Sequence, residues 1–481
     1  MVDFYRQDDI KAITEKIDDI ILEAKKIKLH TIEPKIDKCL EAIDIIKKYI
    51  GKYNRIIYGG TAYHNLIKNK NPKDGIYSEL DCKDIELYSF NPMVDIKELC
   101  KLLSKKFKYI SVQGAAHEET YTFFVNFEQV CDITYMPKFI FDNMPKITIN
   151  GIHYSHPSFI MVDILRQYND PILSYWRLKD KTFFRANKLM KYYPLELGNN
   201  TYIKNKVDKE VLEIINFVFN DIKLISSLIH LGSIANNYYL YPEQIIIDDS
   251  LVCLSSNLHI DATSCYDIIL KFISLKDNLT NADKLVSIEE YHPFFQFWDH
   301  RVVFYYKKYP ILTLLGNNRI CVPYHIIDYT AFDINDKQLS ISQGGKRKIK
   351  RETPTEKKSG FKLATFVLLF NYHLINMHYL YINKKTDDYK QTQALMKQLL
   401  SERNNYLKKN KLTVVDDSLF KEFTFDCIGF TEDLGYKQRS NRDKKIFPFR
   451  YNCDDSDTPN IIFKNTSGNI INETSKRKIF K

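Results

Sequence analysis

The sequence predicts an α/β protein, because helical and strand patterns alternate from residue 8 to residue 192. Isoleucines and other apolar residues recur every three or four positions over 10–24 and again after Pro34, which is typical of amphipathic helices. Residues 55–58 read as a short strand that runs into Gly59 and Gly60, and a helix over 61–67 follows directly.

The next elements of this unit are a strand over 83–89, a helix over 93–107 and two strands over 121–127 and 129–136. From Pro157 the pattern is helical as far as Tyr192. Pro194 and the Gly-Asn-Asn run at 198–200 mark a boundary. We therefore expect a first α/β domain over residues 1–194, with N-terminal helices, and a second domain over 195–481.

The second domain is also expected to be α/β. We predict helices over 211–231 and 363–381 and strands over 245–247, 302–306 and 319–322. Residues 344–360 form a basic, polar loop. We find no internal repeat at a fixed spacing, although a second unit of the same kind can be accommodated in this length.

Composition favours an anionic partner. The 481 residues carry 70 basic and 60 acidic side chains, a net charge of +10, and include 33 Tyr and 30 Phe. An excess of positive charge favours binding to nucleic acid, and aromatic rings can stack on unpaired bases. Most of the aromatic residues are nevertheless explained by packing in the core. The nine scattered cysteines form no C-x-x-C pair, the N-terminus is polar, and the apolar run 363–370 is too short to cross a membrane. We expect a soluble protein of a reducing cytoplasm with no membrane contact.

Three motifs of the first domain belong together. Gly59-Gly60-Thr61 stands between a strand and a helix, where glycines let the backbone approach a phosphate and the helix start attracts an anion. Asp84 and Glu86 alternate with Ile85 on the next strand and therefore share one face. Asp132 lies within a later apolar strand, where a carboxylate needs a metal or an ion pair.

Each motif has an ordinary alternative: a turn with a helix cap, a solvated acidic strand end, and an Asp paired with a base. Together they form the signature of the polymerase-β-like nucleotidyltransferases. In such a site Asp84, Glu86 and Asp132 would be the catalytic residues and hold two divalent metals, which clamp an in-line phosphoryl transfer. Gly59, Gly60 and Thr61 would bind the nucleotide, with the Thr61 hydroxyl as an added donor.

Basic residues follow the acids at helical spacing. Arg177, Lys181, Arg185 and Lys188 lie three or four positions apart, so we expect them on one helix face. They could hold the triphosphate; the alternative is a solvated basic face.

The whole chain resembles the poly(A) polymerase catalytic subunits of poxviruses and other large cytoplasmic DNA viruses, and it is most similar to the giant-virus (mimivirus-like) members. The resemblance rests on these motifs, on His156-Pro157 and Arg166, on Trp176 with the basic helix after it, and on the segments 293–298 and 316–318. It implies a nucleotidyltransferase fold, ATP as substrate, Mg²⁺ or Mn²⁺ as cofactor, and addition of AMP to RNA 3′ ends. Whether the second α/β domain is a degenerate unit of that kind stays open. It also implies a location in the host cytoplasm, in the viral factory or packaged in the virion.

Two departures from that family bear on activity and partners. Glu86 stands where members often have Asp, and a glutamate is an adequate metal ligand. Only 58 residues precede the glycine motif, whereas poxvirus members carry an extra N-terminal domain that helps dock a processivity partner. We therefore expect no separate processivity subunit and predict a homodimer that makes long tails unaided, with residues 195–481 forming most of the interface.

Two other functions stay open. A uridylyl-, CCA- or oligoadenylate-adding enzyme would carry the same motifs, because base choice depends on pocket shape. The second alternative is a non-catalytic RNA-binding scaffold. This role is compatible with the second domain, which lacks a Gly-Gly motif combined with an Asp-x-Asp motif. The loop 344–360 is expected either to contact the RNA backbone or to serve as a charged, solvated loop.

Overall fold

The fold is that of a computed structural model, which describes residues 4–32, 36–78, 83–115, 119–203, 206–241, 247–277, 285–317, 322–328, 360–425, 427–428, 460–464 and 470–472. No helix in these ranges is long and apolar enough to cross a membrane. Four described cysteines are free thiols, Cys100, Cys131, Cys253 and Cys265, whereas Cys39 and Cys427 are disulfide-bonded, which departs from the expectation of reduced cysteines. The basic segment 344–359 and Asn318 lie outside the described residues.

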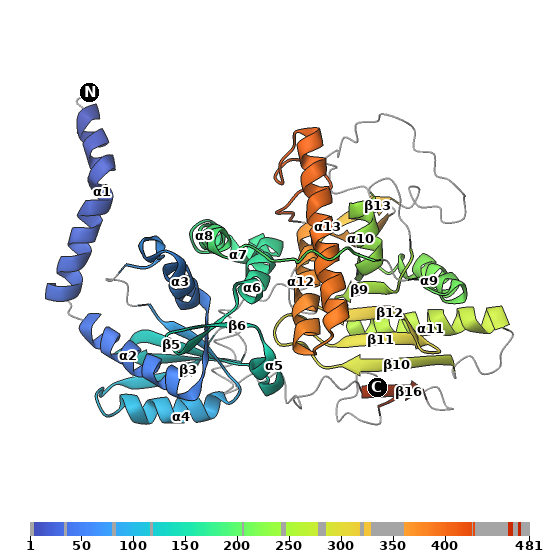
Figure 1. The fold of residues 1–481 in the computed structure, drawn as a ribbon, viewed down its shortest axis with the longest axis horizontal. Helices are drawn as coiled ribbons and strands as arrows, with labels where there is room; N and C mark the ends of the chain where they lie inside the picture. The colour runs from blue at the N-terminus through green and yellow to red at the C-terminus, as the bar shows by residue number, and fades with distance from the viewer. Residues whose placement is uncertain are drawn as a thin grey trace.

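The first unit is a seven-stranded mixed sheet with helices packed on it (Figure 1). Its strand order is β3-β4-β5-β2-β1-β7-β6. The strands are β1 (Ile56–Tyr58), β2 (Ile85–Ser89), β3 (Ile110–Gly114), β4 (Thr120–Val125), β5 (Glu128–Tyr135), β6 (Lys146–Ile149) and β7 (Ile152–Ser155). The helices are α2 (Ile36–Tyr53), α3 (Gly59–Lys70), α4 (Pro92–Leu103), α5 (Lys138–Asn143), α6 (Pro157–Asn169), α7 (Pro171–Ser174) and α8 (Phe184–Tyr192). The predicted strands and helices of residues 36–169 are thus confirmed to within a few residues.

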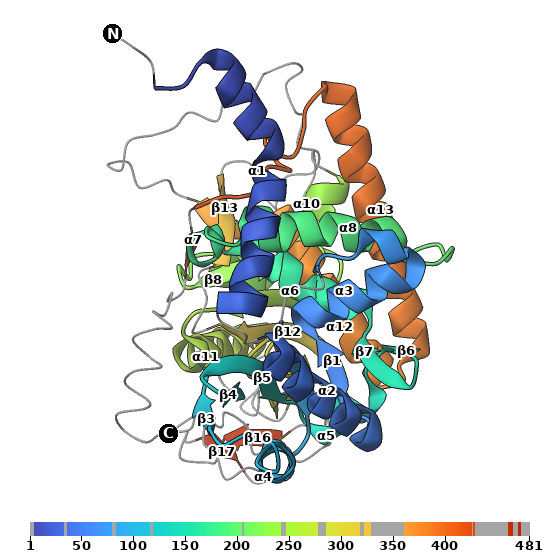
Figure 2. The ribbon, with the colours of Figure 1, turned by 90° about the vertical axis from the view of Figure 1, so that its left-hand side faces the viewer.

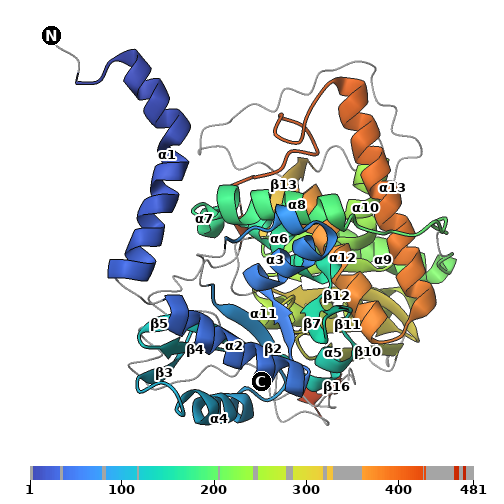
Figure 3. The same cartoon turned by 60° about the vertical axis from the view of Figure 1, so that its left-hand side comes forward.

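Helix α1 (Gln7–Ile27) projects from the body of the protein, as Figures 1 and 3 show from two sides. None of its residues is buried, and its isoleucines face solvent. A short π-helical turn, η1 (Lys28–Ile32), ends it.

The second unit is a ten-stranded sheet in the order β15-β13-β14-β8-β9-β12-β11-β10-β16-β17. Its strands are β8 (Leu228–Leu231), β9 (Leu251–Ser255), β10 (Val286–Tyr291), β11 (Arg301–Tyr306), β12 (Tyr309–Gly316), β13 (Val322–Asp328), β14 (Gly360–Ala364), β15 (Cys427–Ile428), β16 (Asn460–Lys464) and β17 (Ile470–Asn472). Its helices are α9 (Lys209–Ile222), α10 (Gly232–Leu240), α11 (Leu258–Asp277), α12 (Phe366–Ile382) and α13 (Thr386–Asn410).

Seven strands of the second sheet repeat the topology of the first. In the first unit β1 pairs antiparallel with β2, β2 parallel with β5, and β1 parallel with β7. In the second unit β8 pairs antiparallel with β9, β9 parallel with β12, and β8 parallel with β14. The helices α3 and α10 both begin at a glycine directly after the first of these strands. The second domain is therefore α/β, as expected, and it repeats the topology of the first domain, which the sequence left open.

Several elements of this unit differ from their sequence predictions. The helix expected over 211–231 ends at Ile222, and β8 follows it with all four residues buried. The helix expected from residue 363 begins only at Phe366, because β14 runs to Ala364 and Thr365 Oγ1 caps the helix by accepting from the Leu368 amide. Short, fully buried strands show no alternation of apolar and polar residues, so periodicity cannot separate them from helix.

One of two hydrophobic clusters spans both units, and the other lies within the first unit. Figure 2 looks onto the first unit, with the second unit behind it. Helix α6 lies against α12, and the Phe159 and His378 rings stand 5.1 Å apart across this contact. The segment 292–300 between β10 and β11 inserts Phe295 against Tyr88 of β2, with ring centroids 5.5 Å apart. Arg166 Nη1 donates to the Gln296 carbonyl at 3.1 Å. The segment 293–298, which carries the resemblance in the second half, thus contacts the first unit and helps to fix its position. The domain boundary at residue 194 stays a prediction.

Candidate active site

The glycine motif brings the start of α3 against β2. Gly59 has φ +63°, in the left-handed region, and a Cβ there would collide with the Glu86 carboxylate. The Gly60 amide donates to Glu86 Oε2 at 2.6 Å. Thr61 was expected to offer its hydroxyl to an anion, but Thr61 Oγ1 donates to the Asp84 carbonyl at 2.9 Å and the residue is buried. In this structure Thr61 therefore fixes the beginning of β2.

The three predicted acids lie on one side of two neighbouring strands. Glu86 on β2 is directly opposite Asp132 on β5 in the parallel pairing. Asp84 precedes β2 by one residue, and Ile85 between the two acids is buried in the core, as the alternation predicted. The structure thus brings together Asp84, Glu86 and Asp132; their catalytic role stays a prediction.

Two polar residues that the sequence did not single out hold these carboxylates. Thr122 on β4 donates to Asp132 Oδ1 at 2.6 Å. Gln129 Nε2 donates to Asp84 Oδ2 at 2.8 Å and to Asp132 Oδ2 at 3.2 Å. Gln129 stands three positions before Asp132 at the beginning of the same strand, a spacing that gives no signal in the sequence.

Burial and mutual repulsion weaken the acidity of two of these groups. Burial, and after it the charge of Asp84, raises the pKa of Glu86 to about 8, against the lowering effect of the Gly60 hydrogen bond. Burial also raises the pKa of Asp132 to about 6, with the Thr122 hydrogen bond opposing the shift. The carboxylates therefore need a positive group to be ionised together near neutral pH.

The donor set suits a hard divalent cation. Among the described residues, no three His, Cys, Asp or Glu side chains are arranged to hold a metal ion as they stand, because Glu86 turns toward the Gly60 amide. Asp84 and Asp132 nevertheless point an oxygen each at the same Gln129 amide, so both carboxylates reach one positively polarised group. All the available donors are carboxylate oxygens, which Mg²⁺ and Mn²⁺ prefer.

The cations of the predicted basic helix lie on a broken helix. α7 ends at Ser174, a π-helical turn η3 (Leu178–Phe183) follows, and α8 begins at Phe184, so the helical region expected to Tyr192 consists of several segments and the four cations do not share one regular helix. Pro171 begins α7 and interrupts the helical hydrogen bonding. The longer period of a π turn changes the facing of side chains three and four apart.

Arg185 and Lys181 lie near the acids, and Arg177 lies near Lys181. The Arg185 guanidinium lies beside Gly60 and over the Tyr77 ring, 5.4 Å from its centroid. Burial lowers the pKa of Lys181, and the nearby charges of Arg185 and Arg177 lower it further. The structure therefore places positive groups on the side of α3 from which a triphosphate would approach Gly60; this binding role stays a prediction.

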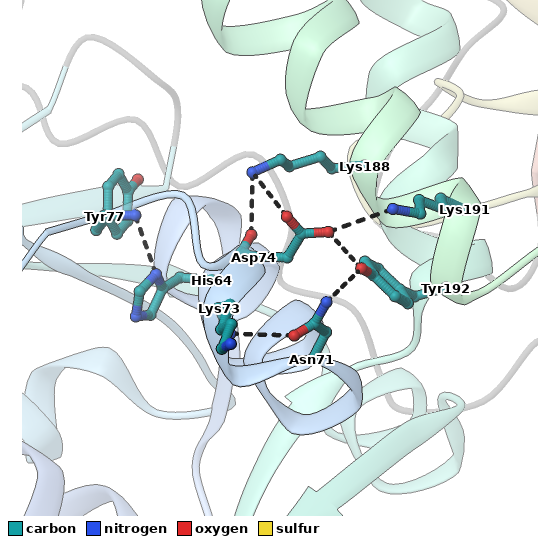
Figure 4. A network of polar contacts seen from close by, with 8 residues as sticks. All are labelled: His64, Asn71, Lys73, Asp74, Tyr77, Lys188, Lys191 and Tyr192. Atoms are coloured by element: carbon teal, nitrogen blue, oxygen red, sulfur yellow. Dashed lines mark hydrogen bonds and ion pairs between the residues drawn. The ribbon is translucent and has the colours of Figure 1, made fainter.

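Lys188 belongs to a different cluster, drawn in Figure 4. Its Nζ donates to the Asp74 carbonyl at 3.1 Å, and Asp74 also receives Lys191 Nζ at 3.5 Å and the Tyr192 hydroxyl. Asp74 ends the 3₁₀ turn η2 (Pro72–Asp74) after α3. The cluster ties the end of α3 to α8, so Lys188 positions α8 instead of facing the acids.

The second unit has lost the acids at the matching positions. Gly232 has φ +55°, and a Cβ there would collide with Val252, as one at Gly59 would with Glu86. Val252 pairs with Leu231 on one side and with Thr313 on the other, as Glu86 pairs with Tyr58 and Asp132. Val252 and Thr313 therefore replace two carboxylates, and Ser250 stands two positions before Val252, so this unit keeps the fold without the donor set.

Comparisons with known proteins agree with this geometry. Residues 44–174 match the family model "Poly(A) polymerase catalytic subunit", and residues 170–481 match "APMV, Putative poly(A) polymerase, catalytic subunit, C-terminal". The protein named "Putative poly(A) polymerase catalytic subunit" of Acanthamoeba polyphaga mimivirus is 28% identical over 97% of this chain and 83% of its own length. Its namesake from African swine fever virus (isolate Pig/Kenya/KEN-50/1950) is 30% identical over 32% of this chain and 33% of its own length.

A solved structure extends the likeness over nearly the whole fold. The crystal structure of the Megavirus polyadenylate synthase superposes with a TM-score of 0.80 at 25% identity, covering 99% of this chain and 98% of that one. The second family model alone matches well over half of the residues. The chain therefore belongs to the family of viral poly(A) polymerase catalytic subunits.

Proposed function

We propose that this protein is a polynucleotide adenylyltransferase that adds AMP from ATP to RNA 3′ ends without a template. The observation that carries the proposal is the convergence of Asp84, Glu86 and Asp132 beside the glycine-containing start of α3. That arrangement suits transfer of a nucleotidyl group, because carboxylates and an anion-binding helix start serve the two ends of one phosphoryl transfer.

Divalent cation use belongs to this activity, and we propose Mg²⁺ or Mn²⁺ held by Asp84, Glu86 and Asp132. A bound cation would lower the pKa of the attacking 3′-hydroxyl and neutralise the triphosphate. Gln129 and Glu86 would then give up their present hydrogen bonds to the carboxylate and to Gly60. The released Gly60 amide and Arg185, which lies beside Gly60, could then bind phosphate oxygens.

The test is extension of an unpaired RNA primer by the pure protein with each nucleoside triphosphate in turn, with Mg²⁺ or Mn²⁺. Adenylate addition that far exceeds uridylate and cytidylate addition supports the proposal. Preferred uridylate or CCA addition would identify the other terminal nucleotidyltransferases. RNA binding without extension would identify a scaffold.

We also propose a homodimer, which the exposed face of α1 supports. Ile10, Ile13, Ile17, Ile20 and Ile27 recur at alternating three- and four-residue steps, with Ala24 in the same series, and all five isoleucines are exposed. This is the a/d spacing of a helix that pairs with another helix. Antiparallel pairing with α1 of a second copy would join isoleucine to isoleucine about a twofold axis.

The charges beside this stripe favour a second copy as the occupant. In an antiparallel pair with Ile17 opposite Ile20 of the second copy, Lys16 of one helix stands beside Glu23 of the other, and the twofold axis makes this pair twice. The expectation that residues 195–481 form most of the interface stays a prediction, as does self-sufficient synthesis of long tails without a processivity subunit.

Light scattering tests the dimer. An Ile17→Asp/Ile20→Asp protein is expected to be monomeric, because two carboxylates then interrupt the stripe. Leu22→Asp is the matched control, since Leu22 is exposed on α1 outside the a/d series. A parent protein of monomeric mass, or a double variant that stays dimeric, would count against pairing through α1.

A location in the host cytoplasm, in the viral factory or the virion, is proposed from the resemblance alone. Immunofluorescence during infection and analysis of purified virions would test it.

A further inference from the structure

Four aromatic rings stand exposed beside the candidate active site. Tyr175, Trp176, Phe183 and Phe184 are 76%, 60%, 60% and 51% exposed. They lie before, at the end of and directly after the π turn η3. α8 is held to the protein by other residues, Ala186 and Leu189, which are buried. The four rings therefore contribute little to packing, and an exposed aromatic cluster is typical of a binding surface.

Cations lie over these rings. Lys181 Nζ is 4.9 Å and Arg177 Cζ is 5.2 Å from the Trp176 ring centroid, and Lys188 Nζ is 5.1 Å from that of Phe184. Positive groups interleaved with exposed rings are the two components of single-strand nucleic-acid binding: the cations attract phosphates, and the rings stack on bases without regard to sequence.

The segment is tied to the acids through α8. Arg185, one residue after Phe184, lies beside Gly60, and α8 packs along α3 (Figure 3). Asp74 fixes the far end of the same helix through Lys188 and Lys191. An RNA whose terminal nucleotide reaches the acids would therefore pass its preceding nucleotides along this side of the protein.

We propose that Tyr175, Trp176, Phe183 and Phe184 form a stacking surface for unpaired bases just upstream of the RNA 3′ end. The proposal rests on the proposed function, of which it specifies the primer site. Rings at both ends of η3 fit several successive bases, whereas a single incoming ATP brings only one. We call this surface the 175–184 surface.

The protein carries its own probe, because its two tryptophans differ in environment. Trp176 is on the 175–184 surface, and Trp298 is buried in the second unit. The experiment titrates the full-length protein with oligoadenylate RNA in EDTA, which prevents extension, and follows tryptophan fluorescence. We expect quenching in the parent and in Trp298→Phe, and none in Trp176→Phe.

Affinity measurements with the same RNA separate stacking from a structural effect. Trp176→Ala is expected to weaken binding roughly 5- to 150-fold, the range of one base–aromatic stack. Trp176→Phe keeps a ring and is expected to bind within a few-fold of the parent. Tyr309→Ala is the matched control, since Tyr309 is similarly exposed on β12 of the second unit, and its binding should not change.

Three outcomes would overturn the proposal. Quenching by ATP alone that equals quenching by RNA would assign the surface to the incoming nucleotide. A blue shift of Trp176 emission with rising protein concentration would assign it to a second copy. If RNA does not change the fluorescence of a parent protein that extends RNA normally, and Trp176→Ala does not change its affinity for RNA, the surface is not the primer site, whereas the polymerase function still holds. Conversely, RNA-dependent quenching in a protein that never extends RNA would uphold the surface and refute the polymerase function.

Discussion

Glu86 on β2 stands directly opposite Asp132 on β5 across a parallel strand pair, and the Gln129 amide bridges Asp132 to the third acid, Asp84. Such a pair of acids repels, and burial adds to the cost, as the raised pKa values of both groups indicate. A protein keeps this arrangement where the charges serve a ligand.

Replacing these acids should abolish extension without unfolding the protein. Loss of a group that merely supports a metal ligand costs 10- to 100-fold in activity, so Asp132→Asn or Asp84→Asn should cost about 100-fold or more. Removing a charge also relieves repulsion, so the Tm without metal should hold or rise. Primer extension and thermal unfolding in EDTA measure the two effects. Near-parental extension by Asp132→Asn would refute the site.

Gly59→Ala should be both unstable and inactive. Alanine at positive φ costs about 1 kcal/mol, and the added Cβ displaces Glu86. Gly151→Ala is the matched control, because Gly151 has φ +77° with open space around it. Gly232→Ala should destabilise through Val252 and leave catalysis intact. Equal activity losses in all three variants would show that backbone strain alone, and not the contact with Glu86, decides the effect.

Gln129→Ala should lower the Tm only when divalent metal is absent. The variant loses two hydrogen bonds to charged oxygens, worth about 1 kcal/mol at this exposed position. Bound Mn²⁺ replaces that positive group, so the difference from the parent should vanish at saturation, and Mn²⁺ affinity by calorimetry should rise. Gln113→Ala on β3 is the control. A Tm difference that persists with Mn²⁺ would indicate a purely structural role.

Asp74→Ala should raise the KM for ATP more than it lowers kcat. Asp74 holds Lys188, Lys191 and Tyr192, and thereby keeps Arg185 of the same helix beside Gly60. Surface ion pairs are individually weak, so we expect a rise of about three- to tenfold. Asp417→Ala removes a comparable surface pair with Lys421 and should change neither constant. A fall in kcat at constant KM would argue that Asp74 acts on the chemical step.

Acid should destabilise the protein through three buried histidines. Burial lowers the pKa of His230 and His373 to about 3 and of His378 to about 4. The native state keeps them neutral, whereas the unfolded state takes up protons below about pH 6.5, so stability is present above that pH and is lost as pH falls toward 4. Each histidine contributes a slope of about 1.4 kcal/mol per pH unit.

Urea unfolding between pH 5 and 6 measures that slope. His373→Gln should reduce it by about the contribution of one histidine, because glutamine can still donate to Asn236 and does not titrate. His259→Gln, at an exposed position of α11, is the control. An unchanged slope in His373→Gln would contradict the assignment.

The sequence by itself determined the catalytic unit. A strand, two glycines and a helix are local signals, and the alternation of Asp84, Ile85 and Glu86 fixes which side chains share a face. Asp132 could be predicted as a site residue from the sequence, because a carboxylate in an apolar strand needs a metal ion or an ion-pair partner. The resemblance to the viral poly(A) polymerases rested on the same residues.

Only the tertiary structure decided what surrounds these residues. Gln129 and Asp74 act on groups far away in the chain or on another strand, and side-chain contacts of that kind leave no periodic trace in a sequence. The sequence left the duplication open, because strand pairing preserves topology while Val252 and Thr313 stand at the positions of the acids and the connections change length. Periodicity records the direction in which each residue points along its own element, whereas contacts between elements depend on how those elements pack.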